Sequence, residues 1–314
     1  MVLMVQKLSK LYHKLENHHH HHHRAELDVL SASLQAFRSD VSNCLSQLLS
    51  SNPNPGSEIL SFPWIQQCLE LLPLINKAFL KLVKHIDYPM TSWEAASLDH
   101  YLNYGLHVLE LLNSASSSLS RLSQARLSFA HALSLVHNSP SMAIEHLKAI
   151  QPQSSSVDIK GLLDKEDREE KFGSCKERIV NEAMVELKSI GFWVFGVVLA
   201  SLSGETKPYL EMKQVIAGFN TALLIDVIDS CVFDVLVEKG ETLKEVKELN
   251  DAANCLVSAI VAGETSDAAA MDMEGKLGDF EKQMEVLEKQ VDALFSKVLA
   301  TRNEGLHCVR QRKQ

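Results

Sequence analysis

The last part of the chain carries an apolar repeat that strongly restricts how it can fold. Between residues 273 and 298, apolar side chains return at alternating steps of four and three, with mostly Glu, Lys and other polar residues between them. This spacing puts one apolar stripe along a single α-helix and is typical of coiled coils and helical bundles. The repeat predicts a long C-terminal helix with a coiled-coil-like face. Its members are Met273, Leu277, Phe280, Met284, Leu287, Val291, Leu294 and Val298.

Helical periodicity extends over most of the remaining chain. Gly (13) and Pro (8) are scarce among 314 residues, so few residues interrupt helical runs. Apolar side chains recur every three or four residues over 27–48, and a second helix is expected over 64–85, with Pro73 kinking or splitting it. Thr91 and Ser92 are N-cap candidates for a third helix. We therefore expect an all-α fold, an elongated multi-helix bundle.

Composition divides the chain into five segments. The polar stretch 151–172 predicts a charged linker between an N-terminal helical bundle, 27–150, and a C-terminal helical bundle, 173–300. A short amphipathic helix followed by a poly-His connector is expected over 1–26, and a small basic tail over 301–314. The expected body is therefore elongated and consists of two helical subdomains.

Residues 189–204 form an uncharged run of 16 residues, SIGFWVFGVVLASLSG. A membrane-spanning helix needs about 20 apolar residues, and a shorter run is more often a buried core helix or an interfacial segment. Burial in the bundle and membrane contact both stay open. The next stretch, 215–240, is apolar nearly all round and predicts a central helix. We expect 189–238 to form the most buried core.

The chain carries no sequence motif for catalysis or cofactor binding. Nucleophile elbows, phosphate-binding loops, dinucleotide fingerprints and zinc-protease helices are absent from the sequence. Its six cysteines are far apart and form no CxxC pair. The formal net charge is −9 and no basic stripe runs along a helix, which argues against a nucleic-acid partner. We expect a non-enzymatic protein without a cofactor or a metal site.

Six consecutive histidines, His18–His23, follow 17 residues of ordinary helical sequence. A purification tag usually adjoins a terminus, so this position favours a native homopolymer run. Neutral imidazoles bind Ni²⁺, Cu²⁺ or Zn²⁺ in vitro. We expect a connector between the first helix and the bundle rather than a physiological metal site.

Four stretches carry a family resemblance. They are MVLMVQKLSKLYHKLENHHHHHH at the start, LDVLSASLQAFRSDVSNCLSQL, FPWIQQCLELLPLINKAFLKLVKHIDYPM, and LDHYLNYGLHVLELLN, which follows Trp93 and Glu94. Together they resemble the plant BYPASS family over nearly the whole chain, most loosely at 93–99 and Asn113. The resemblance implies an all-helical developmental protein that restrains a mobile root-derived signal, which would otherwise arrest shoot growth. It implies no catalytic residues, and the same broad grouping includes proteins linked to the exocyst.

The leading hypothesis is a developmental or signalling protein that acts through protein or membrane partners. The heptad residues are the candidate partner-binding face, although the same residues suit a seam within the bundle. The candidate partner-binding residues are Leu277, Phe280, Met284, Leu287, Val291, Leu294 and Val298.

Two other interpretations stay open. One is a protein that binds a small apolar metabolite, or an unrecognised enzyme, with a bundle pocket near Trp193, Phe195 and Tyr209. The other is membrane attachment through residues 1–16 or 189–204. An intracellular protein is expected, cytoplasmic or associated with endomembranes, with the plastid as the alternative.

Overall fold

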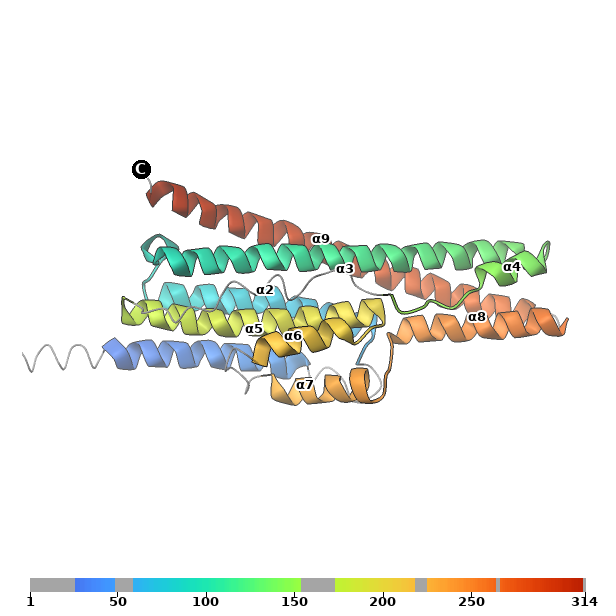
Figure 1. Cartoon of the computed structure of the whole chain (residues 1–314), viewed down its shortest axis with the longest axis horizontal. Helices are drawn as coiled ribbons and strands as arrows, with labels where there is room; N and C mark the ends of the chain where they lie inside the picture. Colours follow the sequence, from blue (N-terminus) through green and yellow to red (C-terminus); the bar gives the residue numbers. More distant parts are fainter. Residues whose placement is uncertain (1–25, 49–58, 154–172, 218–224, 264–265, 313–314) are drawn as a thin grey trace, which may run out of the picture.

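The computed structural model describes residues 26–48, 59–153, 173–217, 225–263 and 266–312. These ranges are almost entirely α-helical and contain no strand. Figure 1 shows an elongated bundle whose helices run roughly along one axis. The expected all-α bundle is therefore confirmed. The first amphipathic segment, the histidine tract and most of the charged linker lie outside the described residues.

Two long helices run through most of the length of the molecule. Helix α3 (Ala95–Leu135) spans nearly the whole bundle, and α9 (Asp267–Arg312) packs against it in the opposite direction (Figure 1). The long C-terminal helix predicted from the heptads is confirmed. Because α3 also packs against α5 (Cys175–Ser203), helices from both sides of the 151–172 stretch contact each other. The division into two subdomains stays a prediction.

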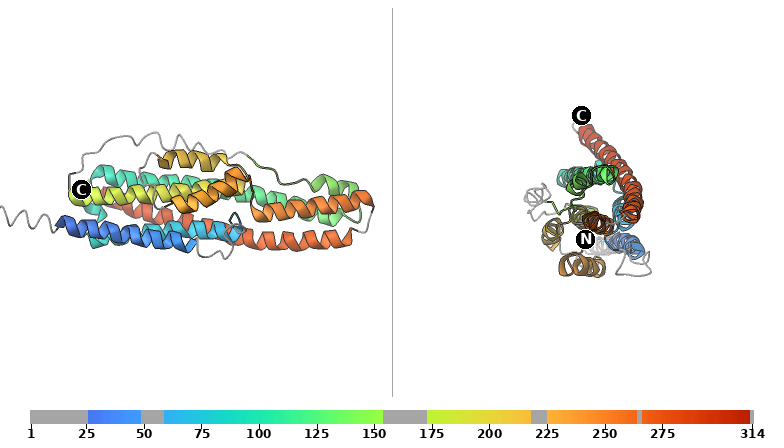
Figure 2. Two further views of the ribbon diagram at one scale, coloured as in Figure 1. Left: turned by 90° about the horizontal axis from the view of Figure 1, so that it is seen from below. Right: turned by 90° about the vertical axis from the view of Figure 1, so that its right-hand side faces the viewer.

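The remaining helices divide between the two ends of the bundle. One end is thicker and contains the helical segment 26–48, α2, α5, α6 and α7 beside the ends of the long helices; the other contains α4 and α8 (Figures 1 and 2). The bounds of these helices are Phe62–His85 for α2, Pro140–His146 for α4, Lys207–Ala217 for α6, Asp226–Phe233 for α7 and Lys244–Ala262 for α8.

The start of α3 differs from its sequence prediction. Thr91 and Ser92 lie in a short 3₁₀ turn, and Glu94 is the N-cap residue, without a side-chain capping bond. The backbone N–H of Glu94 donates to Glu177 Oε1 of α5 (3.2 Å), and its carboxylate accepts from the N–H of Gly173 (2.9 Å). Contacts with Gly173 and with Glu177 of α5, which no local pattern encodes, therefore hold the start of α3.

Helix α2 is one continuous helix through Pro73, so the predicted break is not a split. Ser61 is its N-cap residue, and its hydroxyl accepts from the N–H of Trp64 at 3.4 Å. The serine-rich part of α3 stays helical, and the hydroxyls of Ser117 and Ser120 donate to carbonyls four residues earlier. Local polar sequence therefore does not interrupt either helix.

The apolar stretch 215–240 does not form the predicted central helix. Within the described residues it supplies the end of α6, all of α7 and a π-helical turn, Asp234–Glu238. Helix α7 lies on the flank of the bundle (Figure 1), with Val227 68% exposed. The central position belongs to α5, in which every residue from 186 to 203 is buried. The prediction failed because apolar composition does not by itself determine which helix is surrounded.

Candidate functional site

The heptad face of α9 is buried inside the chain itself. Phe280 is 1% exposed and meets the ring of Phe62 on α2 edge to face, with centroids 5.2 Å apart. Beside this face, Arg126 of α3 pairs with Glu281 at 2.6 Å. The heptad residues thus form an intramolecular seam, and a role in partner binding stays a prediction. Leu277, Met284, Leu287, Val291 and Leu294 are buried, and Val298 is partly buried against the same core.

Helix α5, which contains the uncharged run, is the only helix among the described residues that is long and apolar enough to cross a membrane. In its most apolar window, 94% of the residues are buried inside the bundle. The core helix of a soluble bundle passes the same test of length and composition. The burial of α5 agrees with the interpretation of 189–204 as a buried core helix. Membrane association stays a prediction.

The ligand pocket expected near Trp193, Phe195 and Tyr209 lies in packed core. These side chains are at most 2% exposed. The Asp229 carboxylate accepts from Trp193 Nε1 (2.9 Å), from the Tyr209 hydroxyl (2.6 Å) and from Lys213 Nζ (2.6 Å). Burial and the neighbouring Asp229 carboxylate raise the pKa of Tyr209. These bonds join α5, α6 and α7, so the cluster holds these helices together.

A small apolar cavity lies between α2, α3 and α9 and has a volume of about 70 Å³. Tyr101, Tyr104 and Arg302 contribute polar groups to its lining. Burial raises the pKa of Tyr101 to about 12 and raises that of Tyr104 further, so both phenols are neutral. The Arg302 Nε is buried without a hydrogen-bond partner among the described residues. This volume admits a few waters but is far below the roughly 300 Å³ of a typical ligand pocket.

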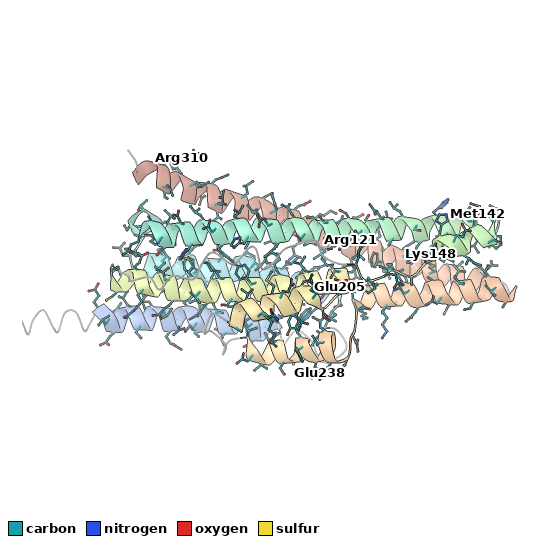
Figure 3. The ribbon with its side chains drawn as sticks, in the orientation of Figure 1. Arg121, Met142, Lys148, Glu205, Glu238 and Arg310 are labelled. Atoms are coloured by element: carbon teal, nitrogen blue, oxygen red, sulfur yellow. The ribbon has the colours of Figure 1, made fainter. Side chains whose placement is uncertain are left out.

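A larger cleft, of about 550 Å³, opens where the two ends of the bundle meet. We call it the central cleft. It lies between the middle of α3, the residues after α4, the end of α5 and the start of α8. Figure 3 labels Arg121, Lys148 and Glu205 around this junction. Its apolar lining consists of Leu122, Ala125, Leu202, Leu243 and Val246, and its charged lining of Arg121, Glu145, His146 and Lys148.

One wall of the central cleft is the extended stretch 147–153, which we call the junction segment. The Asn250 amide of α8 forms two hydrogen bonds with the backbone of Ile150, at 2.7 and 3.1 Å. The N–H of Gln153 donates to the carbonyl of Ser203 at the end of α5 (3.0 Å). Just before the segment, Ser128 of α3 donates to the carbonyl of His146 (3.1 Å). Three helices therefore hold this wall in place.

The described residues contain no group of three or more His, Cys, Asp or Glu side chains that could hold a metal ion. The histidines of the N-terminal half do meet at one place, where the rings of His131 and His146 lie 4.7 Å apart. That pair joins α3 to α4 at the edge of the central cleft. The histidine tract, for which only metal binding in vitro is expected, lies outside the described residues.

Sequence reasoning did not select the central cleft. Arg121 lies in a serine-rich part of α3 and Lys148 follows a short helix, so neither stands in a recognisable motif. Their common site depends on the bonds that Asn250, 100 residues away in the chain, makes with the junction segment. The nearest sequence signal was the change in composition at 151–172, which overlaps the end of the segment.

No family model matches the chain, and no solved structure matches it. Among known proteins, it is 22% identical over 294 residues to Protein BPS1, chloroplastic, of Arabidopsis thaliana. The alignment covers 88% of this chain and 83% of that protein. The resemblance to the BYPASS family is confirmed. The chain is also 24% identical over 257 residues to UPF0496 protein 4 of Oryza sativa subsp. indica.

The two matches differ in coverage. The rice match covers 76% of this chain but only 56% of the rice protein, so the chain spans little more than half of that relative. The match to BPS1 covers most of both chains. The comparison with BPS1 is therefore the more informative one for the bundle as a whole.

Proposed function

We propose that this chain is a non-enzymatic developmental protein of BYPASS type that acts through protein or membrane partners. In this proposal it restrains a mobile root-derived signal that would otherwise arrest shoot growth. The observation that carries the proposal is the similarity to BPS1 over 88% of the chain. Similarity over that length extends to most of the bundle rather than to one helix.

The test is replacement of BPS1 in Arabidopsis plants that lack it. Expression of this chain should restore shoot growth, and grafting should show that expression in the root alone is sufficient. A variant with Val194→Glu and Val198→Glu, both fully buried positions in α5, is the matched control because it should not fold. An arrested shoot above roots that accumulate the wild-type chain would contradict the proposal.

A second candidate function is the binding of a small metabolite, and the central cleft favours it. Its volume of about 550 Å³ lies in the range of ligand sites, and ligand sites often lie where two parts of a protein join. The candidate cleft lies at the middle of α3 and not at Trp193. Ligand-induced protection against thermal unfolding would test it, because a ligand that binds only the folded chain raises the melting temperature.

A further inference from the structure

We propose that the central cleft binds a small organic anion, with its charged group at Arg121 and Lys148 and an apolar body against α3, α5 and α8. The proposal rests on the second candidate function, for which it names the class of ligand. It is carried by the position of two cations in one cleft, by the lack of a carboxylate partner for them in the described part of the chain, and by the fixed wall that carries Lys148.

Arg121 differs from Arg38, Arg126 and Arg178 in forming no ion pair within the described residues, and Arg302 and Arg310 form none there either. Arg38 and Arg126 each meet a glutamate at 2.6 Å, and Arg178 meets one at 3.7 Å. Within the described ranges, the Arg121 guanidinium forms no ion pair, and its Nη2 donates to the hydroxyl of Ser118 at 2.8 Å. That bond orients the guanidinium along α3 and leaves donors for a second group. Guanidinium groups bind planar carboxylates through paired hydrogen bonds.

Lys148 brings a second positive charge from the opposite wall. It is exposed, and no described carboxylate forms an ion pair with it. The bonds of His146, Ile150 and Gln153 to three different helices fix the backbone on both sides of Lys148. This wall is therefore already ordered, and ligand binding costs less conformational entropy there.

The charge of the central cleft favours an anion. Its lining contains the cations Arg121 and Lys148, and Glu145 is the one carboxylate among the lining residues. Glu145 is exposed, whereas Arg121 is half-buried. Attraction to a half-buried cation is screened less by solvent than attraction to an exposed one, so the deeper part of the cleft is positive.

The apolar part of the lining sets the second requirement for the ligand. Leu122, Leu202 and Val246 are buried, and each comes from a different helix. An inorganic ion would leave this surface and most of the 550 Å³ filled only with water. A ligand with both an apolar body and one anionic group uses both kinds of lining.

The test compares two fluorescent probes that share an apolar body. Anilinonaphthalene sulfonate carries one negative charge, and phenylnaphthylamine is its neutral counterpart. We expect the full chain to bind the sulfonate saturably, and Arg121→Gln and Lys148→Gln each to weaken that binding by roughly tenfold, the value of one charge-assisted hydrogen bond. Binding of the neutral probe should change by less than about twofold, because it makes no such bond.

Matched controls separate the cleft from general charge effects. Arg126→Gln and Lys247→Gln each remove one positive charge from α3 or α8 outside the cleft lining, and they should leave sulfonate binding unchanged. Ala125→Trp, which fills the cleft from α3, should abolish binding of both probes. Circular dichroism verifies that every variant keeps its helices.

The outcomes distinguish the two levels of the proposal. If both probes bind equally and Arg121→Gln has no effect, the anion preference is wrong while metabolite binding in the cleft stands. If neither probe binds saturably, the second candidate function fails and the ligand class fails with it.

Sedimentation with phosphatidylcholine vesicles containing phosphatidylserine is the last arm. Vesicle binding that Arg121→Gln abolishes, without saturable binding of the sulfonate, would assign the cations to lipid headgroups and overturn the proposal.

Discussion

Helices α5 and α9 both carry sequence patterns suited to binding outside the chain, yet both use those patterns inside the bundle. In α5, every residue from 186 to 203 is buried, and neighbouring helices surround it. In α9, one stripe packs against α2, α3 and α8, and the opposite face carries ion pairs such as Lys289–Glu285. The two helices therefore differ in how many sides the protein covers, not in whether their apolar side chains are buried.

This difference predicts the largest effect for charges inside α5. Val194 and Val198 are fully buried, and Val194→Glu together with Val198→Glu puts two carboxylates into the core. Each buried charge costs several kcal/mol, which together approach the roughly 5–15 kcal/mol of total stability of a typical protein. We expect the variant to lose cooperative unfolding, measured by circular dichroism.

Val227→Glu on α7 is the control for this charge effect, because Val227 is 68% exposed and should tolerate the change. Membrane fractionation of the wild-type chain and the α5 variant gives the deciding comparison. If the wild type pellets with membranes and resists carbonate while the variant is soluble and folded, α5 is a membrane anchor rather than the bundle core.

Truncation of the α9 seam should have the next largest effect. Leu287 is fully buried, so Leu287→Ala should lower the free energy of unfolding by about 2–5 kcal/mol. Val286, the next residue, is 51% exposed, and Val286→Ala should cost less than about 0.5 kcal/mol. Urea unfolding measures both values. Equal, small losses would show that the heptad face is free for a partner instead of packed in the seam.

The buried charges of α5 also respond to pH in a way that the surface pairs of α9 do not. Glu186 is buried, and Arg38 contacts it at 2.6 Å. Burial raises the pKa of Glu186, while the Arg38 guanidinium lowers it. Arg38→Met should cost about 1–3 kcal/mol at neutral pH, because it leaves a buried carboxylate without its cation.

The sign of the pH dependence follows from the raised pKa of Glu186. A carboxyl group with a raised pKa in the folded state stabilises the fold most below its unfolded value, near 4.3, and loses that contribution as the pH rises through the folded value. The cost of Arg38→Met should therefore shrink towards pH 4, measured as the melting temperature of each protein at pH 4 and pH 7. Lys289→Met on α9 is the control and should cost about 0.5 kcal/mol or less at both values. A second change, Glu186→Gln, should remove most of the penalty; if it does not, charge is not the cause.

Apolar periodicity predicts helices and their buried faces well, because it depends only on neighbours along the chain. It predicted the face of α9 down to single residues such as Leu287. It could not decide what covers Val198, because a membrane and a surrounding bundle both contact an apolar helix surface. It also did not find the central cleft, since Arg121 and Lys148 line one cleft only because of long-range bonds such as that of Asn250. Tertiary contacts therefore carry the information that the sequence pattern lacks.

The glycines of α5 and α9 give the smallest effects, and these should have opposite signs. A Cβ on Gly196 of α5 would lie 2.9 Å from the Cβ of Met212 and 3.3 Å from the Cα of Tyr209. Gly196→Ala therefore forces α6 away from α5, which costs about 1–3 kcal/mol and outweighs the roughly 1 kcal/mol gained in helix propensity. On α9, nothing lies within 4 Å of a Cβ at Gly275. Gly275→Ala should therefore stabilise the chain by up to about 1 kcal/mol.

The melting temperatures of the two glycine variants test the comparison between the helices most sharply, because the chemical change is identical. Gly278→Ala repeats the α9 result at a second position with open space around it. If Gly196→Ala also stabilised the chain, α5 and α6 would not be closely packed, and the uncharged segment would have a side free for lipid. If only Gly196→Ala lowers the melting temperature, α5 is covered by protein rather than by lipid at this position. The reason is that only a close neighbour can make one added methyl group unfavourable.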